Sequence, residues 1–459
     1  MNTHLAILLL SGLFAVLPLN AANKLPRMLQ YFPKQRQLVC IDGSNRYTRA
    51  LYGGHSLVRL ETSDRPVFAI YDGKRSRNIA FSITVNGYTT SLDSTTHCEA
   101  RYRGGRRSYI LTDNRWSSKA KLCITALATR QNEGAIWIFR TQHFTAPPCL
   151  TVKIGQVRRW KMLRGGDLGL EPRESYEAAL NVPPLFIESA PIDTMLVVHY
   201  QHPDSCHLLH SKAAHQLANT EERLLDSLTS MVCWTTPDAL INTLDANLVA
   251  AADGLWDGHT WRIPLAGWRG AYVGDVLGWA DRARSHFYAY ANSQVTDIPP
   301  IEPHPTQDTA QQLSRGAERW GTPMYSNGYI CRVPDNNRKM NHYDMNLNYV
   351  DELLWHFAYN ADTLQLRHFW PLLKSHLAWE KRNWDPDNDH LYDAYCCIWA
   401  SDALYYNGGA VTHSSAYNYR GHLLAARMAE LLGEDPLPYR AEAEAIKKAI
   451  DQRLWLPQQ

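Results

Sequence analysis

The spacing of apolar residues changes near residue 235, and no other feature of the sequence limits its possible folds as strongly. Between about residues 36 and 230, short β-branched runs are separated by turn signals such as Asn86-Gly87 and Gly104-Gly105. From about residue 238 onward, apolar residues recur at the spacing of an α-helix. The sequence therefore predicts a multidomain chain, with a β domain followed by a helical domain.

The strands of the β domain are short and follow one another without a long helical stretch. Seven of them can be placed from the apolar runs: 57–62, 67–71, 79–85, 122–129, 135–141, 150–154 and 195–200. This pattern favours a two-sheet antiparallel β-sandwich, which we place at 23–232.

The remaining part, 233–459, is expected to consist of helices joined in pairs. Seven helices are predicted: 238–254, 274–291, 307–320, 343–360, 362–382, 414–432 and 437–454. Gly433 ends one helix and Pro436 opens the next, and Asn360-Ala361-Asp362 is a tight joint between another pair. Consecutive αα-hairpins of this kind predict an α/α solenoid or toroid.

The N-terminal segment is typical of a secretory signal peptide. Residues 5–19 are mostly apolar, Asn20-Ala21-Ala22 offers a cleavage site, and the first charged residue is Lys24. Because the first residues lack the usual Lys or Arg, an uncleaved membrane anchor is the alternative, although the apolar run is short for a membrane span. We predict a signal peptide at 1–22, a periplasmic or secreted protein, and no membrane attachment after its removal.

Charge and cysteine usage exclude several classes of protein. The 459 residues include 47 Lys and Arg against 45 Asp and Glu, and a formal charge of +2 gives no basic field for nucleic acid. Nine cysteines lie without a disulfide framework or zinc spacing, so most are expected to be small buried apolar residues and some to be free. Since P-loop, dinucleotide, nucleophile-elbow and H-E-x-x-H motifs are missing, we predict neither a cofactor nor a metal.

Three long connections between the expected helices are rich in Trp, Tyr, Asp, Asn and Gly: 255–273, 321–342 and 383–413. Twelve of the 15 tryptophans lie beyond residue 230. Indole rings pack on the flat C–H faces of sugars, while Asp, Asn and Arg bind sugar hydroxyls, so such loops suit a carbohydrate cleft. Trp268, Trp384 and Trp399 are the expected platforms, and helix packing is the alternative for at least half of the twelve rings.

Carboxyl groups are the expected catalytic groups, because glycoside hydrolysis needs two of them and no cofactor. Asp402 lies in a loop among aromatic residues, and such surroundings raise the pKa of a carboxyl group as a general acid requires. We predict that Asp402 is the acid, with an ordinary loop cap as the alternative. His413, at the end of the same loop, either binds a sugar hydroxyl or precedes a helix N-cap.

A second group of candidates lies in the glycine-rich segment 267–284. Asp275 falls in the first turn of a predicted helix, with Arg269 before it and Asp281 and Arg282 after it. We expect Asp275 to be catalytic and the other three to bind sugar. The alternative for Asp275 is a structural one, since an acid in a first turn also complements the helix dipole.

A third group opens the predicted helix 343–360 with the acids Asp344, Asp351 and Glu352. One of them is expected to reach the mouth of a cleft, and the other two to serve the structure. We assign the catalytic role to Glu352.

Acids at 385, 387 and 389 have the one-three-five spacing of an oxygen-ligand calcium loop. The segment then departs from that pattern, because His390 replaces the required Gly and Cys396 falls where the bidentate Glu should be. An EF-hand is therefore not expected, and a loop of Asx-turns or a calcium site of another design remains.

Three segments carry a resemblance to a known family: Gly267-Trp-Arg-Gly-Ala-Tyr-Val-Gly-Asp275, Asp385-Pro-Asp-Asn-Asp-His-Leu-Tyr-Asp393 and the helix from Tyr417-Asn-Tyr-Arg420 to Gly433. With the order of domains, they resemble bacterial six-hairpin glycosidases. These are exported (α/α)6-toroid enzymes with an N-terminal β-sandwich, and they include α-L-rhamnosidases, trehalases and α-glucosidases. The resemblance implies a carbohydrate substrate and an acid in a mid-toroid loop. Trp399-Ala-Ser-Asp402 is similar to the trehalase branch, and 267–275 to the rhamnosidase branch.

The resemblance also implies an incomplete toroid, because twelve helices are needed and seven are predicted before Gln459. We expect a truncated domain that lacks its second catalytic carboxylate and associates with another chain through an apolar last hairpin. Two other functions stay open. One is a non-catalytic glycan-binding protein, and the other is a polysaccharide lyase with a Tyr or His base.

Overall fold

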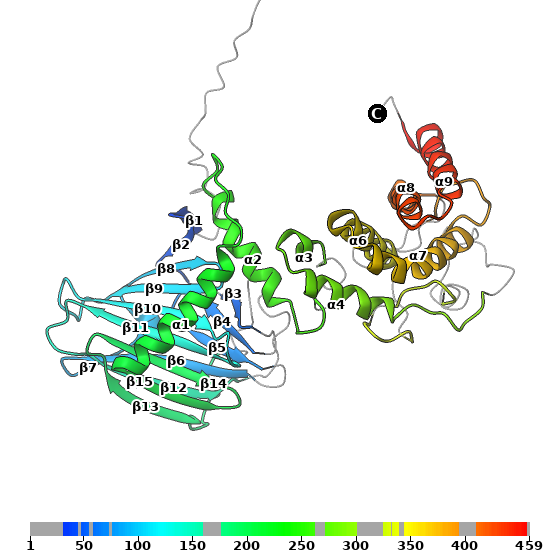
Figure 1. Cartoon of the computed structure of the whole chain (residues 1–459). Coiled ribbons are helices and arrows are strands. Elements are labelled where there is room, and N and C mark those ends of the chain that lie inside the picture. The colour runs from blue at the N-terminus through cyan, green and yellow to red at the C-terminus, as the bar shows by residue number, and fades with distance from the viewer. Residues whose placement is uncertain are drawn as a thin grey trace, which may run out of the picture.

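The computed structural model describes residues 31–44, 47–54, 58–72, 76–158, 176–261, 271–300, 325–331, 333–338, 344–393 and 410–456. Two antiparallel sheets form the first part of the chain and helices form the second, as Figure 1 shows. This confirms the prediction of a β domain followed by a helical domain.

The first sheet has eight strands in the order β1-β2-β8-β9-β10-β11-β14-β15. Their bounds are β1 (Tyr31–Lys34), β2 (Gln37–Ile41), β8 (His97–Arg103), β9 (Arg106–Thr112), β10 (Lys121–Ala128), β11 (Gly134–Gln142), β14 (Met195–Gln201) and β15 (Ser205–His210). The second sheet has the order β13-β12-β6-β5-β4-β3, with β7 also paired to β6. Its bounds are β13 (Phe186–Pro191), β12 (Cys149–Gln156), β6 (Ser76–Val85), β5 (Phe68–Tyr71), β4 (Arg59–Ser63), β3 (Tyr47–Tyr52) and β7 (Tyr88–Ser91). All pairings between these strands are antiparallel.

The core of the sandwich forms where the inner faces of the two sheets meet. In β8 and β9 every second side chain is buried, as expected for strands with one face on a core. Phe68 and Phe81 of the second sheet pack edge-on against Trp137 of the first, with ring centroids 5.6 and 5.4 Å apart. At the turn between β8 and β9, Gly104 and Gly105 have φ of +43° and +75°, a conformation that glycine adopts without strain.

Helix α1 (Ser211–Thr229) covers the outer face of the eight-stranded sheet (Figure 1). Its buried Ala214 and Ala218 pack against Ile136 and Val197. This second layer explains why β11 is an unbroken apolar run, because both faces of the strand are covered. The sequence did not predict α1. The side of this helix that is buried begins with alanines, and such small residues among charged ones give only a weak apolar pattern.

The helical domain contains seven of the described α-helices: α2 (Leu244–Gly254), α3 (Tyr272–Val276), α4 (Ala280–Ala291), α6 (Asp344–Asn360), α7 (Thr363–Trp384), α8 (Thr412–Leu432) and α9 (Leu437–Ala449), which continues as a π-turn over Ile450–Leu454. The helix predicted at 274–291 is two helices, because Gly278 has φ +71° and ends α3. The helix predicted at 307–320 lies outside the described residues.

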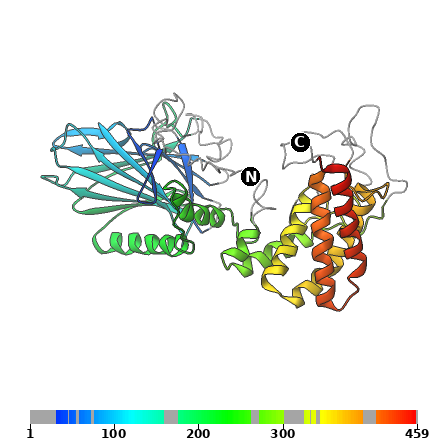
Figure 2. The same ribbon diagram turned by 90° about the horizontal axis from the view of Figure 1, so that it is seen from above.

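The predicted hairpins α6–α7 and α8–α9 are present, and Figure 2 shows α8 and α9 side by side. Gly433 caps α8 at φ +75°. The outward side of α9 carries Glu444, Lys447 and Lys448 where an apolar face was expected. Leu423 and Leu431 of α8 are nevertheless 46% and 47% exposed. Association with another chain stays a prediction.

The joint between α6 and α7 gives a stability prediction. Asp362 is the N-cap of α7 and its Oδ1 accepts a hydrogen bond from the Gln365 backbone N–H at 3.0 Å. Asp362→Ala should lower the free energy of unfolding by about 1 kcal/mol in urea denaturation. Asp362→Asn keeps an acceptor oxygen and should lose much less, so equal losses in the two variants would contradict the capping role.

Seven cysteines are described; Cys40, Cys98 and Cys206 are free and buried, and Cys331 is buried as well. This confirms the prediction for the described part, while Cys396 and Cys397 lie outside it. Among the described helices, none combines the length and apolarity needed to cross a membrane.

Candidate functional site

The connectivity of the helices gathers the long connections at one end of the domain. Because the α6–α7 and α8–α9 joints are short, the helices of each pair run antiparallel. The start of α6, the end of α7 and the start of α8 therefore lie at the end opposite these joints. The segments 292–343 and 385–411 both attach there, as expected for connections that border a site.

A cavity lies between α6, α7 and α8, a few turns below that end. The space itself is small, about 10 Å³, which is room for roughly one water molecule, and it opens to solvent. Its polar lining consists of Asp351, His376, Tyr417 and Asn418, and the rest is mainly apolar. One carboxylate, one imidazole, one phenol and one amide thus face a space between three helices.

Asp351 is the centre of the polar contacts at this cavity. Its Oδ1 accepts a hydrogen bond from Arg420 Nε of α8 at 2.5 Å, and its Oδ2 accepts one from the hydroxyl of Tyr272 of α3. Burial, followed by the contact with Asp351, raises the pKa of Tyr272 far above its usual range, so the phenol keeps its proton and donates. Both oxygens of Asp351 act as acceptors here.

An aromatic pair continues from this carboxylate along α6. Trp355 lies one turn after Asp351, is 38% exposed, and meets the ring of Tyr272 edge-on at 6.2 Å between centroids. An exposed indole close to a carboxylate and a guanidinium is an arrangement that can bind a sugar, with the ring on the C–H face and the polar groups on hydroxyls.

Glu352, predicted as catalytic, is fully buried. Consecutive helical residues point about 100° apart. Asp351 therefore reaches the cavity while Glu352 lies inside the packing of α6, where it contributes with burial to the raised pKa of Tyr349. The acid at the cavity is therefore Asp351, and the assignment of Glu352 is wrong.

Asp275, the second predicted catalytic acid, is buried where α3 meets α6. Its Oδ1 lies 2.8 Å from Nδ1 of His356, and Nε2 of His356 lies 2.9 Å from Oε1 of Gln365 on α7. Its Oδ2 is buried without a hydrogen-bond partner in the described part of the chain. The contacts are those of a structural pair that joins three helices.

Asp281 and Arg282, predicted to bind sugar, have other partners. The side chain of Asp281 is 96% exposed and pairs with Arg284 on the surface of α4. The guanidinium of Arg282 donates to Asp253 Oδ1 at 3.0 Å and stacks over Trp279, with 4.4 Å to the ring centroid. The structure thus uses Arg282 to hold α4 on α2.

The other predicted residues have mixed positions. Trp384 is 1% exposed and packs edge-on against Trp379 at 6.2 Å, so its faces are not available to a ligand. His413 is the second residue of α8 and contacts the ring of Tyr417, and burial lowers its pKa. Three further predicted residues and the predicted acid lie outside the described residues: Trp268, Arg269, Trp399 and Asp402.

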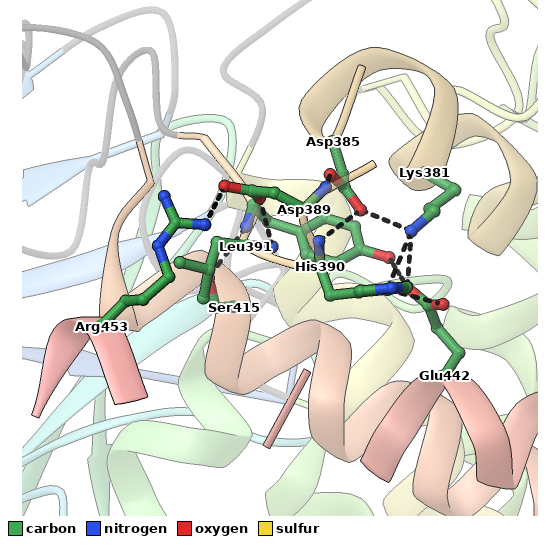
Figure 3. A network of polar contacts seen from close by, with 9 residues as sticks. Lys381, Asp385, Asp389, His390, Leu391, Ser415, Glu442 and Arg453 are labelled. Atoms are coloured by element: carbon green, nitrogen blue, oxygen red, sulfur yellow. Dashed lines mark hydrogen bonds and ion pairs between the residues drawn. The ribbon is translucent and has the colours of Figure 1, made fainter. Parts of the chain in front are cut away.

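Two groups of side chains have the spacing that a metal ion needs: Asp385 with Asp387 and Asp389, and Asp385 with His390 and Glu442. In the first group, Asp385 Oδ1 accepts from the Asp389 backbone N–H and Asp389 Oδ1 from that of Leu391, both at 2.9 Å. These are the bonds of the Asx-turn alternative. The second group encloses Lys381, shown in Figure 3.

Sequence reasoning underrated the residues that meet at the cavity. Asp351 and Trp355 are four residues apart, which places them on one face of a helix, and this signal was available. Tyr272 and Arg420 both lie in segments used for the family resemblance, but their contact with Asp351 spans 79 and 69 residues. One sequence does not show such pairs.

Comparisons with known proteins give a partial match. A family model described as a domain of unknown function (DUF4450) matches residues 75–182, within the sandwich. No curated protein matches the chain. Among solved structures, a bacterial glucoamylase complexed with acarbose has 9% identity and a TM-score of 0.42, covering 90% of this chain and 70% of that chain. A rhamnosidase from Klebsiella oxytoca with rhamnose bound has 11% identity and a TM-score of 0.36, covering 92% of this chain and 72% of that chain.

Proposed function

We propose that this chain is an exported, six-hairpin glycosidase-like protein that binds oligosaccharide or polysaccharide on the surface around Asp351 and Trp355 of α6, next to the small cavity between α6, α7 and α8. The observation that carries the proposal is the group around Asp351, a carboxylate that lines the cavity, contacts Arg420 and Tyr272, and lies one turn from the exposed Trp355 that packs on Tyr272. Planar hydrogen-bonding groups next to an exposed indole are what a pyranose ring requires. The order of domains and the quoted sequence segments support the same function.

We further propose that the reaction is hydrolysis with two carboxyl groups. Asp351 accepts two hydrogen bonds, which suits the group that activates water or attacks the sugar. Asp402, in the aromatic-rich connection between α7 and α8, is proposed as the acid on the strength of its sequence surroundings.

Glycan binding without hydrolysis is the second candidate, and one observation favours it. Because Arg420 and Tyr272 already engage both oxygens of Asp351, a reacting group would have to displace one of them. A lyase is less well supported. Of the candidate bases, burial raises the pKa of Tyr272 beside the cavity and lowers that of His376 in it to about 3, which leaves Tyr417 as the cavity's other candidate.

The proposal is tested by replacing the two acids and following both turnover and binding. We expect the full chain to release reducing ends from at least one member of a panel of plant and bacterial polysaccharides. Asp351→Asn and Asp402→Asn should each slow release roughly 100-fold or more. In affinity electrophoresis, Asp402→Asn should still bind, whereas Trp355→Ala should lose binding.

Asp281→Asn is the matched control, since Asp281 is an exposed acid of the same domain and should change neither turnover nor binding. Binding without turnover in the unmodified chain would favour the glycan-binding alternative. Absence of both on every polysaccharide would reject the carbohydrate assignment. Export is checked by N-terminal sequencing of protein from the periplasm or medium, which should begin near residue 23.

A further inference from the structure

Lys381 lies inside a group of side chains that has the composition of a metal site. Its Nζ is 2.5 Å from Asp385 Oδ2, 2.9 Å from Glu442 Oε1 and 3.3 Å from His390 Nδ1 (Figure 3). An ammonium has three protons and no acceptor, so Lys381 donates to both carboxylates, while His390 Nδ1, which also lies 3.1 Å from Glu442 Oε2, either accepts from Lys381 or donates to Glu442 according to its tautomer. The three ligand atoms that a cation would use therefore surround the nitrogen.

The surroundings of Lys381 favour a permanent positive charge there. The side chain of Asp385 is fully buried and that of Glu442 largely so. Burial opposes the charge of Lys381, but the bonds to Asp385 and Glu442 outweigh it and raise the pKa of the ammonium. Burial raises the pKa of Asp385, whereas Lys381 and His390 overcome burial at Glu442 and lower its pKa.

The group connects two segments that are distant in the sequence. Lys381 and Asp385 close the end of α7, His390 belongs to the connection that follows, and Glu442 comes from α9. In that connection, Asn388 and His390 have φ of +55° and +65°, which is unfavourable for residues with a Cβ and needs compensating contacts. Ser415 adds one, because its hydroxyl accepts from the Tyr392 backbone N–H at 2.9 Å.

We propose that Lys381 is a built-in cation that fastens the connection 385–393 to α9 without a metal ion. Its ammonium holds Asp385, His390 and Glu442 together as a divalent cation would. Shortening Lys381 to Ala would leave two carboxylates and an imidazole with ligand atoms within 4.8 Å of one another. That set suits Mn²⁺, which accepts oxygen and imidazole ligands. The proposal does not depend on the function proposed above.

The first test compares stability. Lys381→Met keeps the length of the side chain without its charge, and should lower the thermal midpoint of the full chain by roughly 10 °C. Lys447→Met is the matched control. Lys447 pairs with Asp451 at the same i,i+4 spacing and the same 2.5 Å, but both side chains are more than half exposed, so its removal should shift the midpoint by less than about 2 °C. Equal shifts in the two variants would overturn the proposal.

The second test uses Mn²⁺ as the probe, because free thiols such as the exposed Cys233 would bind zinc. By calorimetry and electron paramagnetic resonance, Lys381→Ala should bind one equivalent at least tenfold more tightly than the unmodified chain. The double variant Lys381→Ala/Glu442→Gln should lose that gain. If Lys381→Ala folds only with Mn²⁺ present, the proposal is supported as well.

Three results would contradict the proposal. The first is binding of Mn²⁺ by the unmodified chain together with loss of that binding in the single variant Glu442→Gln. The cation that occupies the site would then be a metal ion and not Lys381. The second is a folded Lys381→Ala that gains no affinity. The third is a Lys381→Ala chain that Mn²⁺ does not rescue from misfolding.

Discussion

Acidification from pH 6.5 to pH 4.5 is expected to lower the free energy of unfolding by roughly 7 kcal/mol, with a slope that approaches about 4 kcal/mol for each pH unit below pH 5.5. The cause is a set of three histidines buried in the helical domain: His286, His376 and His422. Burial lowers the pKa of His286 and of His376 to about 3 and that of His422 to about 4. A loss of this size is comparable to the whole stability of a typical domain.

The direction follows from the protons bound in each state. Above about pH 7.5 these histidines are neutral both in the folded and in the unfolded chain, so they add no pH dependence there. Below pH 6.5 the unfolded chain binds a proton on each ring, while the folded chain does not until the pH approaches 4 for His422 and 3 for the others. Stability therefore falls as the pH falls through this window, by about 1.4 kcal/mol per unit for each histidine.

The contacts of His286 and His422 agree with the neutral form, whereas at His376 burial opposes the charge that Glu380 Oε1, 3.8 Å from its Nε2, would favour. Nδ1 of His286 accepts a hydrogen bond from the Trp261 backbone N–H at 3.3 Å, which an imidazolium could not do. His376 is stacked on Trp379 with 6.0 Å between centroids. Both ring nitrogens of His422 are buried without a hydrogen-bond partner in the described chain. The charge of Glu442 favours protonation of His422 and that of Lys381 opposes it, and burial exceeds both.

The measurement is urea denaturation at intervals between pH 7.5 and 4.5. His286→Gln should reduce the slope of stability against pH by about a third, because one of the three buried rings is removed. Replacing the exposed His215 by Gln should leave the slope unchanged. Carboxyl groups such as Asp113, whose pKa is lowered to about 2 chiefly by Arg115, act mainly below pH 4 and do not mask the effect. A slope under about 1.4 kcal/mol per unit would contradict the prediction.

The parts of the fold that could be predicted depend on local signals. The turn at Gly104-Gly105 and the end of α8 at Gly433 could be predicted from the sequence. Both positions need a positive φ, which only glycine adopts freely. Helix α1 was missed because the alanines of its buried stripe look neutral in sequence. Helices α3 and α4 were merged because Gly278 lies between two stretches of suitable composition.

The candidate site depended more on distant contacts and was predicted less well. To choose between Asp351 and Glu352, one must know which side of α6 faces the cavity. The sequence does not show this, because apolar residues lie on most sides of that helix. Trp384 looked like a loop residue, yet it closes α7 from inside the core. Arg282 looked like a ligand-binding cation, but its partner Asp253 lies 29 residues earlier on another helix.

Replacing Asp253 should be the most damaging single substitution at the contact between sandwich and helices, with a loss of about 3–5 kcal/mol. The side chain of Asp253 on α2 is 1% exposed and lies between two guanidinium groups. Arg130, from the loop between β10 and β11, is 2.8 Å from its Oδ2, and Arg282 of α4 is 3.0 Å from its Oδ1. Asp253→Asn keeps the shape but leaves two largely buried cations without their anion.

Chemical denaturation of the full chain checks this loss, with Asp281→Asn as the control. Asp281 is also paired with an arginine, but on the surface, so its replacement should change the free energy of unfolding by less than about 0.5 kcal/mol. We also expect the single transition to broaden or split in Asp253→Asn, because the sandwich and the helices lose a shared anchor. A loss below about 1 kcal/mol would mean that water satisfies both guanidinium groups.

Double-mutant cycles can separate the two halves of this contact. Arg130 belongs to the sandwich, where its backbone N–H also donates to the buried Glu221 of α1 at 2.7 Å. The coupling energy between Arg130→Met and Asp253→Asn therefore measures how strongly this ion pair attaches the sandwich to the helices. Arg282 lies over Trp279 and Trp256, so its coupling measures how α4 is held on α2. Because the Arg130 side chain is 15% exposed and that of Arg282 27%, the first coupling should be the larger. The reverse order would show that Asp253 chiefly organises the helices, and that other contacts, such as Arg36 with Asp245, hold the domains together.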